Sequence, residues 1–199
     1  MKKALLLVGV LIISVLTTAC INNLAVQELN TKAKNYLDNG DYKNAIERLK
    51  SSIDLDNTIF ESHYNLAVAY TKNEDYAEAI EAYNNAIKLN PDFADAYYSL
   101  AVCEENLALD IISGNVKVNE DNTFEKASSQ EEIVENSEDK KLILTDNSKK
   151  AVYDLLTKAA EDYKIYIDKT TDTNSAKQVQ DKIGELEKRA QEYKPAVKE

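Results

Sequence analysis

Few residues of this sequence are of a type that could carry out chemistry. The chain has one histidine, His63, and two cysteines, Cys20 and Cys103, among its 199 residues. A histidine acts as a general base only when a nucleophile or a substrate proton lies within reach, and the sequence specifies no serine or cysteine paired with His63. It contains no glycine-rich phosphate loop, no CxxC pair and no HExxH motif. We therefore expect a packing role for His63, and we expect no enzymatic activity, small-molecule substrate, cofactor or metal.

The stretch Asn-Glu-Asp-Asn at residues 119–122 offers closely spaced oxygen ligands of the kind that bind calcium. An EF-hand loop also needs a central glycine for its turn and a glutamate at its end, and this stretch has neither. We expect a solvated loop here rather than a metal site.

Cys20 follows a short positive start (residues 1–3), an apolar run (4–16) and a run of small residues, and this order is typical of an export signal. The stretch LTTAC at 16–20 resembles a bacterial lipobox, although Thr17 replaces the leucine usual there. The resemblance implies a signal peptide over 1–19, an acyl chain such as palmitate on Cys20, and a short tether over 20–25. The alternative is an uncleaved signal anchor, because residues 4–21 are just long enough to span a bilayer. Either way the rest of the chain is exported and attached to the cell-envelope membrane, on its periplasmic or extracellular face.

Composition favours an all-helical protein that does not bind nucleic acid. The chain has 4 Gly and 2 Pro, too few for the many tight turns of a sheet protein. Its formal charge is −11, and a phosphate backbone would require clustered Lys and Arg instead. If Cys20 carries lipid, Cys103 is the one remaining thiol and has no internal disulfide partner; a buried position for it is more common than a redox role.

The clearest pattern is a repeat with a period of 34 residues. DYKNAIERLKSSIDLDN at 41–57 returns as DYAEAIEAYNNAIKLNP at 75–91, and Ala33, Ala67 and Ala101 coincide when the chain is shifted by this period. Within each unit the apolar residues follow two helical stretches separated by a short turn. Ala67 and Ala79 are small because the two helices cross closely there, and Asp75 is the expected N-cap of the second helix.

These units resemble tetratricopeptide repeats (TPRs), with units at 26–59 and 60–93 and a third over 94–173. The second unit carries the family signature, except that Glu74 stands where a turn glycine is usual. Its signature residues are Leu66, Ala67, Tyr70, Ala79, Tyr83, Ala86 and Pro91. The first unit is weaker, with Ser52 at a position normally occupied by alanine. The resemblance implies an all-α solenoid of three stacked helical hairpins.

An acidic insertion over 113–147 interrupts the third unit, and its low hydrophobicity predicts a mostly disordered or loosely helical segment. A partner-binding role for this segment is the alternative. We expect the helices on either side to extend against each other, with Leu107, Ile111 and Ile112 packing on Val152, Leu155 and Leu156. Residues 174–199 then supply a capping helix and tail.

In TPR proteins the first helix of each unit lines a concave groove that binds a peptide or a partner's helix, and the resemblance assigns that role here. The groove positions of the three units are Gln27, Asn30 and Lys34; Glu61, Tyr64, Asn65, Val68 and Lys72; and Asp95, Tyr98, Ser99, Val102 and Glu105. Tyr64 and Tyr98 are the strongest candidates, because paired tyrosines can stack on a ligand and donate hydrogen bonds. The alternative is that they only pack on neighbouring helices.

One known TPR mode is disfavoured. Some chaperone-binding TPR domains hold a partner's terminal carboxylate with two lysines, two asparagines and an arginine. The corresponding positions here are Asn30, Lys34, Asn65, Asp95 and Ser99. Only Asn65 matches, and Asp95 would repel a carboxylate.

The sequence therefore predicts an exported, membrane-anchored scaffold that binds another protein or peptide of unspecified identity through its groove. One alternative is an accessory lipoprotein of the pilotin or outer-membrane-assembly type. An adaptor for an envelope hydrolase is a third possibility, with less support from the residues.

Overall fold

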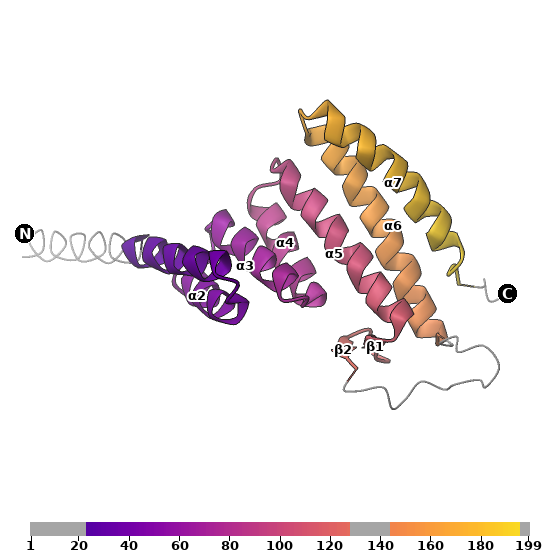
Figure 1. Cartoon of the computed structure of the whole chain (residues 1–199), viewed down its shortest axis with the longest axis horizontal. Helices are drawn as coiled ribbons and strands as arrows, with labels where there is room; N and C mark the ends of the chain where they lie inside the picture. The colour runs from indigo at the N-terminus through magenta and orange to yellow at the C-terminus, as the bar shows by residue number, and fades with distance from the viewer. Residues whose placement is uncertain (1–22, 128–143, 196–199) are drawn as a thin grey trace, which may run out of the picture.

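The computed structural model describes residues 23–127 and 144–195, which form a curved array of helices (Figure 1). Residues 23–38 are helical. The helices that follow are α2 (Tyr42–Leu55), α3 (Phe60–Lys72), α4 (Tyr76–Leu89), α5 (Ala94–Ser113), α6 (Asp146–Lys169) and α7 (Thr173–Gln191). A small antiparallel hairpin of β1 (Val116–Val118) and β2 (Phe124–Lys126) lies between α5 and α6. The expected all-α architecture is confirmed.

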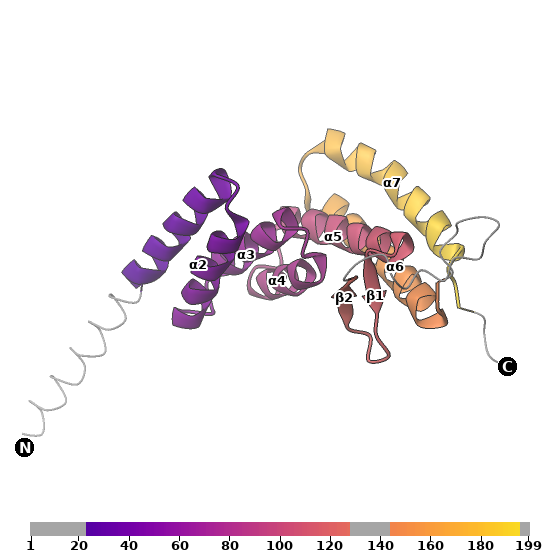
Figure 2. The same cartoon turned by 60° about the horizontal axis from the view of Figure 1, so that its bottom comes forward.

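Each helix packs on the one before it, and α5, α6 and α7 lie side by side at the C-terminal end (Figures 1 and 2). Ala67 and Ala79 are both fully buried in one apolar cluster, where α3 packs against α4. These are the positions at which the sequence predicts small residues. The absence of larger side chains allows the two backbones to approach closely.

The helices on either side of the insertion extend against each other as predicted. Leu107 and Ile111 of α5 share a buried cluster with Val152, Leu155 and Leu156 of α6, and Ile112 packs at its edge. The same cluster takes in Val179, Ile183 and Leu186 of α7. The C-terminal helix therefore caps the array by completing this core.

The first part of the insertion is more ordered than expected. Val116 pairs with Lys126 and Val118 with Phe124 in the hairpin. Val116 is buried and Val118 and Phe124 pack on the α5–α6 core, so a few apolar residues fix a segment whose average composition is strongly charged. The hairpin loop uses its polar side chains internally, because Asp121 accepts hydrogen bonds from the backbone and hydroxyl of Thr123. Residues 128–143 of the insertion lie outside the described residues.

Asp75 occupies the N-cap position of α4, but its side chain accepts no hydrogen bond from the helix backbone. Instead the carboxylate binds the amide of Asn73 and the ammonium of Lys126 on β2. The expected capping bond is thus replaced by a contact that joins the hairpin to the turn before α4.

The predicted signal peptide (1–19) and the candidate lipidation residue Cys20 lie outside the described residues. Within residues 23–127 and 144–195, no helix is both long enough and apolar enough to cross a membrane.

Candidate binding groove

Helix α5 presents four of the predicted groove residues on one face. Asp95, Tyr98, Ser99 and Val102 are spaced by three, four and seven residues, which places them along one side of a helix. The preceding first helix, α3, carries Glu61, Tyr64, Asn65 and Val68 at the same spacing. Because α3 and α5 occupy equivalent positions in successive units, these two faces line the same side of the array.

A cavity of about 510 Å³ opens on this side. We call it the central cavity. It is lined by Tyr64, Asp95, Tyr98, Ser99, Tyr166, Ser175, Gln178, Val179 and Lys182. The structure therefore brings together four of the residues predicted for the groove, Tyr64, Asp95, Tyr98 and Ser99.

Tyr64 is held in place by other aromatic rings. Its ring centroid lies 5.0 Å from that of Phe93 and 5.7 Å from that of Tyr83, in both cases edge to face. Burial raises the pKa of the Tyr64 phenol, while a hydrogen bond with Ser99 opposes that rise. The hydroxyl thus reaches across to α5 and stays protonated at neutral pH.

Tyr98 is held from the other side of the cavity. Its ring centroid lies 5.5 Å from that of Tyr163 and 5.2 Å from that of Tyr166, both on α6. It is nevertheless 40% exposed, one of the few large apolar side chains with so much surface in the described residues. Tyr64 and Tyr98 therefore pack on neighbouring helices and also line the central cavity, and their binding role stays a prediction.

A second cavity, of about 490 Å³, continues the same side toward the N-terminus. We call it the N-terminal cavity. Its lining residues are Asn23, Val26, Gln27, Asn30, Thr31, Asp56, Ile59 and Glu61. Glu61 of this cavity and Tyr64 of the central cavity are one helical turn apart on α3, and we refer to the two cavities together as the groove.

The side chain of Asn30 forms hydrogen bonds that connect neighbouring helices. Its amide donates to Ser62 Oγ at 2.9 Å and to Ser52 Oγ at 3.2 Å, and the two serine hydroxyls lie 3.0 Å apart. Both serines are completely buried. Ser52, which departs from the alanine usual in the repeat, is thus explained by a hydrogen-bond network that joins the first helical segment to α2 and α3.

The remaining predicted groove residues line neither cavity. Val68 and Val102 are half-buried and pack against the core. Asn65 is half-buried, while Lys34 and Lys72 are exposed. Glu105 forms an ion pair of 2.6 Å with Lys182 at the edge of the central cavity.

Sequence reasoning missed the contribution of α7, although a signal for it exists. Ala159 lies 80 residues after Ala79, an offset longer than the 34-residue period because of the insertion and the extra length of α5 and α6. The same offset takes Asp95, Tyr98, Ser99 and Val102 to Ser175, Gln178, Val179 and Lys182, the four α7 residues that line the central cavity. Helix α7 therefore stands where the first helix of a fourth unit would stand.

The other candidate chemical residues are committed to the core. His63 is buried, and its Nε2 donates to the backbone carbonyl of Asn57 at 2.9 Å, which confirms the expected packing role. Cys103 is fully buried beside the Thr71 hydroxyl, and burial raises the pKa of its thiol to about 11. Among the described residues, no group of three or more His, Cys, Asp or Glu side chains is arranged to hold a metal ion.

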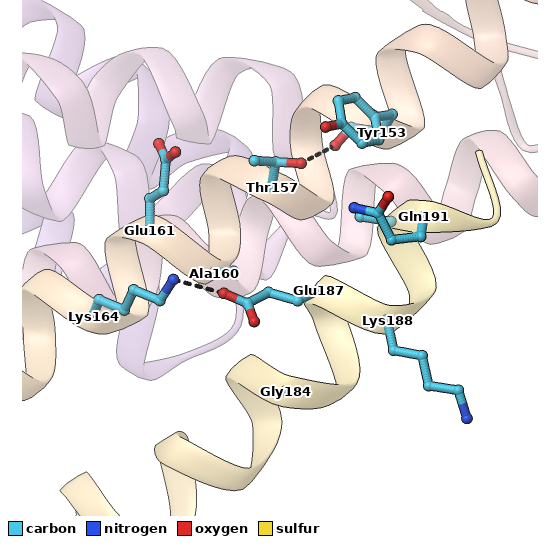
Figure 3. Close-up of a pocket in the computed structure, with 10 residues that line it drawn as sticks. Tyr153, Thr157, Ala160, Glu161, Lys164, Gly184, Glu187, Lys188 and Gln191 are labelled. Atoms are coloured by element: carbon cyan, nitrogen blue, oxygen red, sulfur yellow. Dashed lines mark hydrogen bonds and ion pairs between the residues drawn. The ribbon is translucent and has the colours of Figure 1, made fainter. Parts of the chain in front are cut away.

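A further cavity, of about 500 Å³, lies between α6 and α7 (Figure 3). The ion pair of Lys164 with Glu187, at 2.6 Å, spans it from one helix to the other. Lys188 points away from it into solvent (Figure 3). None of the predicted groove residues lines this cavity.

Comparisons with known proteins agree with this arrangement. A family model described as tetratricopeptide repeat matches residues 60–93, and one described as TPR repeat matches residues 33–74. No curated protein sequence matches the chain.

Several solved structures are similar in fold. The second TPR domain of human RPAP3, in complex with the HSP70 peptide SGPTIEEVD, has a TM-score of 0.55 and 16% identity, covering 82% of this chain and 98% of that one. The first TPR of Spaghetti (RPAP3), bound to the HSP90 peptide SRMEEVD, has a TM-score of 0.52 and 17% identity, covering 81% and 94%. The Yersinia enterocolitica type III secretion chaperone SycD, in complex with a peptide of the translocator YopD, has a TM-score of 0.50 and 11% identity, covering 83% and 92%. Residues 33–93 are therefore tetratricopeptide repeats, and the chain folds as an all-α solenoid of the TPR type.

Proposed function

We propose that this protein is an exported scaffold, attached to the cell-envelope membrane by a lipid on Cys20, that binds a segment of another protein in its groove. The observation that carries the proposal is the central cavity, where Tyr64 and Tyr98 from consecutive first helices stand on the same open surface.

The two tyrosines suit a protein interface for a physical reason. Each is fixed by ring contacts to its own neighbours, so little side-chain entropy is lost when a ligand packs against it. Each also combines an apolar ring with a hydroxyl that can donate a hydrogen bond, which is why tyrosine is enriched at interfaces. The three solved structures named above each hold a peptide, and we propose the same class of ligand here.

Export and anchoring rest on the first twenty residues. A positive start, an apolar run and Cys20 after small residues together favour a lipidated mature terminus. Mass spectrometry of the protein purified from its own cells should find acyl chains on Cys20 and no residues before it. A Cys20→Ala protein should leave the membrane fraction; if it stays there, the lipid anchor is wrong.

The groove is tested by crosslinking in the cells that produce the protein, followed by identification of the attached partner. The variant Tyr64→Ala with Tyr98→Ala should lose at least about tenfold of the crosslinked partner, because two interface aromatics are removed. A matched control is Leu55→Ala with Leu89→Ala, since these residues also lie one repeat apart, are 43% and 41% exposed, and line neither cavity of the groove. Equal capture by both double variants would show that the groove is not the binding site.

A further inference from the structure

We propose that the segment bound in this groove presents a basic side chain, lysine or arginine, which enters the central cavity between Tyr64 and Tyr98 and pairs with Asp95. The inference rests on the proposed function, and it specifies the chemistry of the partner.

The cavity has aromatic walls with space between them. Among the described residues, Tyr64 has ring contacts with Phe60, Tyr83 and Phe93, and Tyr98 has them with Tyr163 and Tyr166, but no ring contact joins Tyr64 to Tyr98. Both rings line the central cavity, so a ligand side chain that enters it can contact both tyrosines. The faces of such rings attract a cation through their quadrupole.

Asp95 supplies the negative charge for that cation. It is exposed, it lines the central cavity, and it forms no ion pair with any described residue. It is also near enough to the Tyr64 hydroxyl to raise the pKa of that group. The carboxylate and the Tyr64 ring therefore belong to the same end of the cavity.

The one cation in the cavity lining is already neutralised. Lys182 lies 2.6 Å from Glu105 in an ion pair, and its ammonium stands 5.3 Å from the centre of the Tyr163 ring. With Lys182 and Glu105 cancelling each other, Asp95 leaves the central cavity with a net negative charge. An acidic ligand would meet repulsion there, whereas a basic one would gain a partner.

The rest of the groove has the same sign. The N-terminal cavity is lined by Asp56 and Glu61, and by no lysine or arginine. The whole chain carries a formal charge of −11, which attracts a basic segment over a longer range before contact. Charge complementarity therefore favours an extended segment with basic residues over the acidic peptides bound by the two RPAP3 domains.

The test uses three capped tripeptides that differ only in their central residue: Leu-Lys-Leu, Leu-norleucine-Leu and Leu-Glu-Leu. Each is titrated to about 10 mM into the full chain in mild detergent, with the ring signals of Tyr64 and Tyr98 followed by NMR; this range measures dissociation constants near 1 mM. We expect the lysine peptide to shift both tyrosines and to bind about tenfold more tightly than the norleucine peptide, from one ion pair and one cation–aromatic contact together. We expect the glutamate peptide to bind more weakly than either.

Asp95→Asn removes the ion pair but not the aromatic contact, so it should reduce binding of the lysine peptide about threefold and leave the norleucine peptide unchanged. Glu81→Gln is the matched control, because it removes the same charge from an exposed position on α4 that lines none of the three cavities. Its binding should equal that of the unaltered chain.

The inference is overturned if the lysine peptide leaves Tyr64 and Tyr98 unshifted, if it binds no better than the norleucine peptide, or if Asp95→Asn has no more effect than Glu81→Gln. The proposed function has its own separate test. If capture of the partner depends on Tyr64 and Tyr98 but basic segments are not preferred, only this inference is wrong. If capture does not depend on either tyrosine, the proposed function is wrong.

Discussion

Glu104 is the most unusual side chain of the core. It projects from α5 with 3% of its surface exposed, and its Oε2 atom has no hydrogen-bond partner among the described residues. Burial is the main reason that its pKa lies well above the ordinary carboxyl value, and the neighbouring Asp162 carboxylate adds to the effect. The positive charge of Lys158 lowers the pKa of Glu104, and the negative charge of Glu161 raises it. The pKa of Asp162 is also raised, chiefly by burial. The α5–α6 interface therefore holds two neighbouring carboxyl groups whose pKa values are both raised by burial.

This pair predicts that stability falls as pH rises. The folded chain binds protons at Glu104 that the unfolded chain releases above its ordinary carboxyl pKa of about 4.5, so the free energy of unfolding is higher in acid and is lost as pH rises through the folded pKa. The variant Glu104→Gln should be more stable than the native chain by about 1–3 kcal/mol at pH 8 and should show less loss between pH 5 and pH 8, because its amide needs no proton. Urea denaturation at the two pH values measures both effects.

A control separates this effect from the general acidity of the chain. Glu81→Gln removes an exposed carboxylate from α4 and should leave the pH dependence as it is in the native chain. If Glu104→Gln and the native chain lose the same stability between pH 5 and pH 8, the buried pair does not carry the effect.

At the scale of the helices, three turns end their helix in the same way. Gly40, Glu74 and Gly114 all have positive φ, at 75°, 59° and 76°. In each case the next residue donates its backbone N–H to a carbonyl five residues back, which is the Schellman arrangement. Gly40 and Glu74 are one period apart. In the third unit the equivalent turn comes later, at Gly114, and this delay gives α5 its extra length and its long contact with α6.

The two equivalent turns predict opposite effects of substitution. Left-handed backbone costs a residue with a Cβ about 1–2 kcal/mol, so Glu74→Gly should raise the free energy of unfolding by up to about 1 kcal/mol once the entropy of glycine is counted. Gly40→Ala should lower it by about 1 kcal/mol. A Cβ at Gly40 would have no neighbouring heavy atom within 4 Å, so the backbone alone accounts for this loss. Thermal or urea unfolding of both variants checks the pair, and a neutral Gly40→Ala would contradict it.

At the scale of the whole molecule, the core is divided in two. One cluster holds the first two units together with Leu100 and Cys103 of α5, and the other joins α5, α6 and α7 with the hairpin. Helices in such an array contact mainly their neighbours, so stability is distributed along the chain rather than shared by all of it. Lys126 of the hairpin, bound to Asp75, adds one tie between the two parts of the array.

This division predicts graded protection against hydrogen exchange. The backbone amides of α5 and α6 should exchange most slowly, because these helices share the larger cluster and have packed neighbours on both sides. Residues 23–38 should exchange fastest among the helices, since they stand at the end of the array. Exchange measured by mass spectrometry tests the order, and uniform protection along the chain would contradict it.

The sequence by itself determined the repeating part of this protein. A 34-residue period with small residues at Ala67 and Ala79 predicted paired helices that cross closely, and apolar spacing predicted that Leu107 and Ile111 meet Val152 and Leu156 across the insertion. These features can be predicted because the spacing of apolar residues indicates which face of each helix is buried. The resemblance to tetratricopeptide repeats, rather than periodicity, placed Tyr64, Tyr98 and Ser99 on one surface.

Tertiary structure alone decided which further side chains line the groove and which predicted groove residues form contacts within the protein instead. Lys182 of α7 lines the central cavity, and Asn30 donates hydrogen bonds to two buried serines. Both contacts depend on which distant helix packs beside these residues. The hairpin also depends on tertiary packing, because Val116 is buried only where α5 and α6 pack together. Periodicity predicts which face of a helix is buried, but it does not specify which other helix packs against that face.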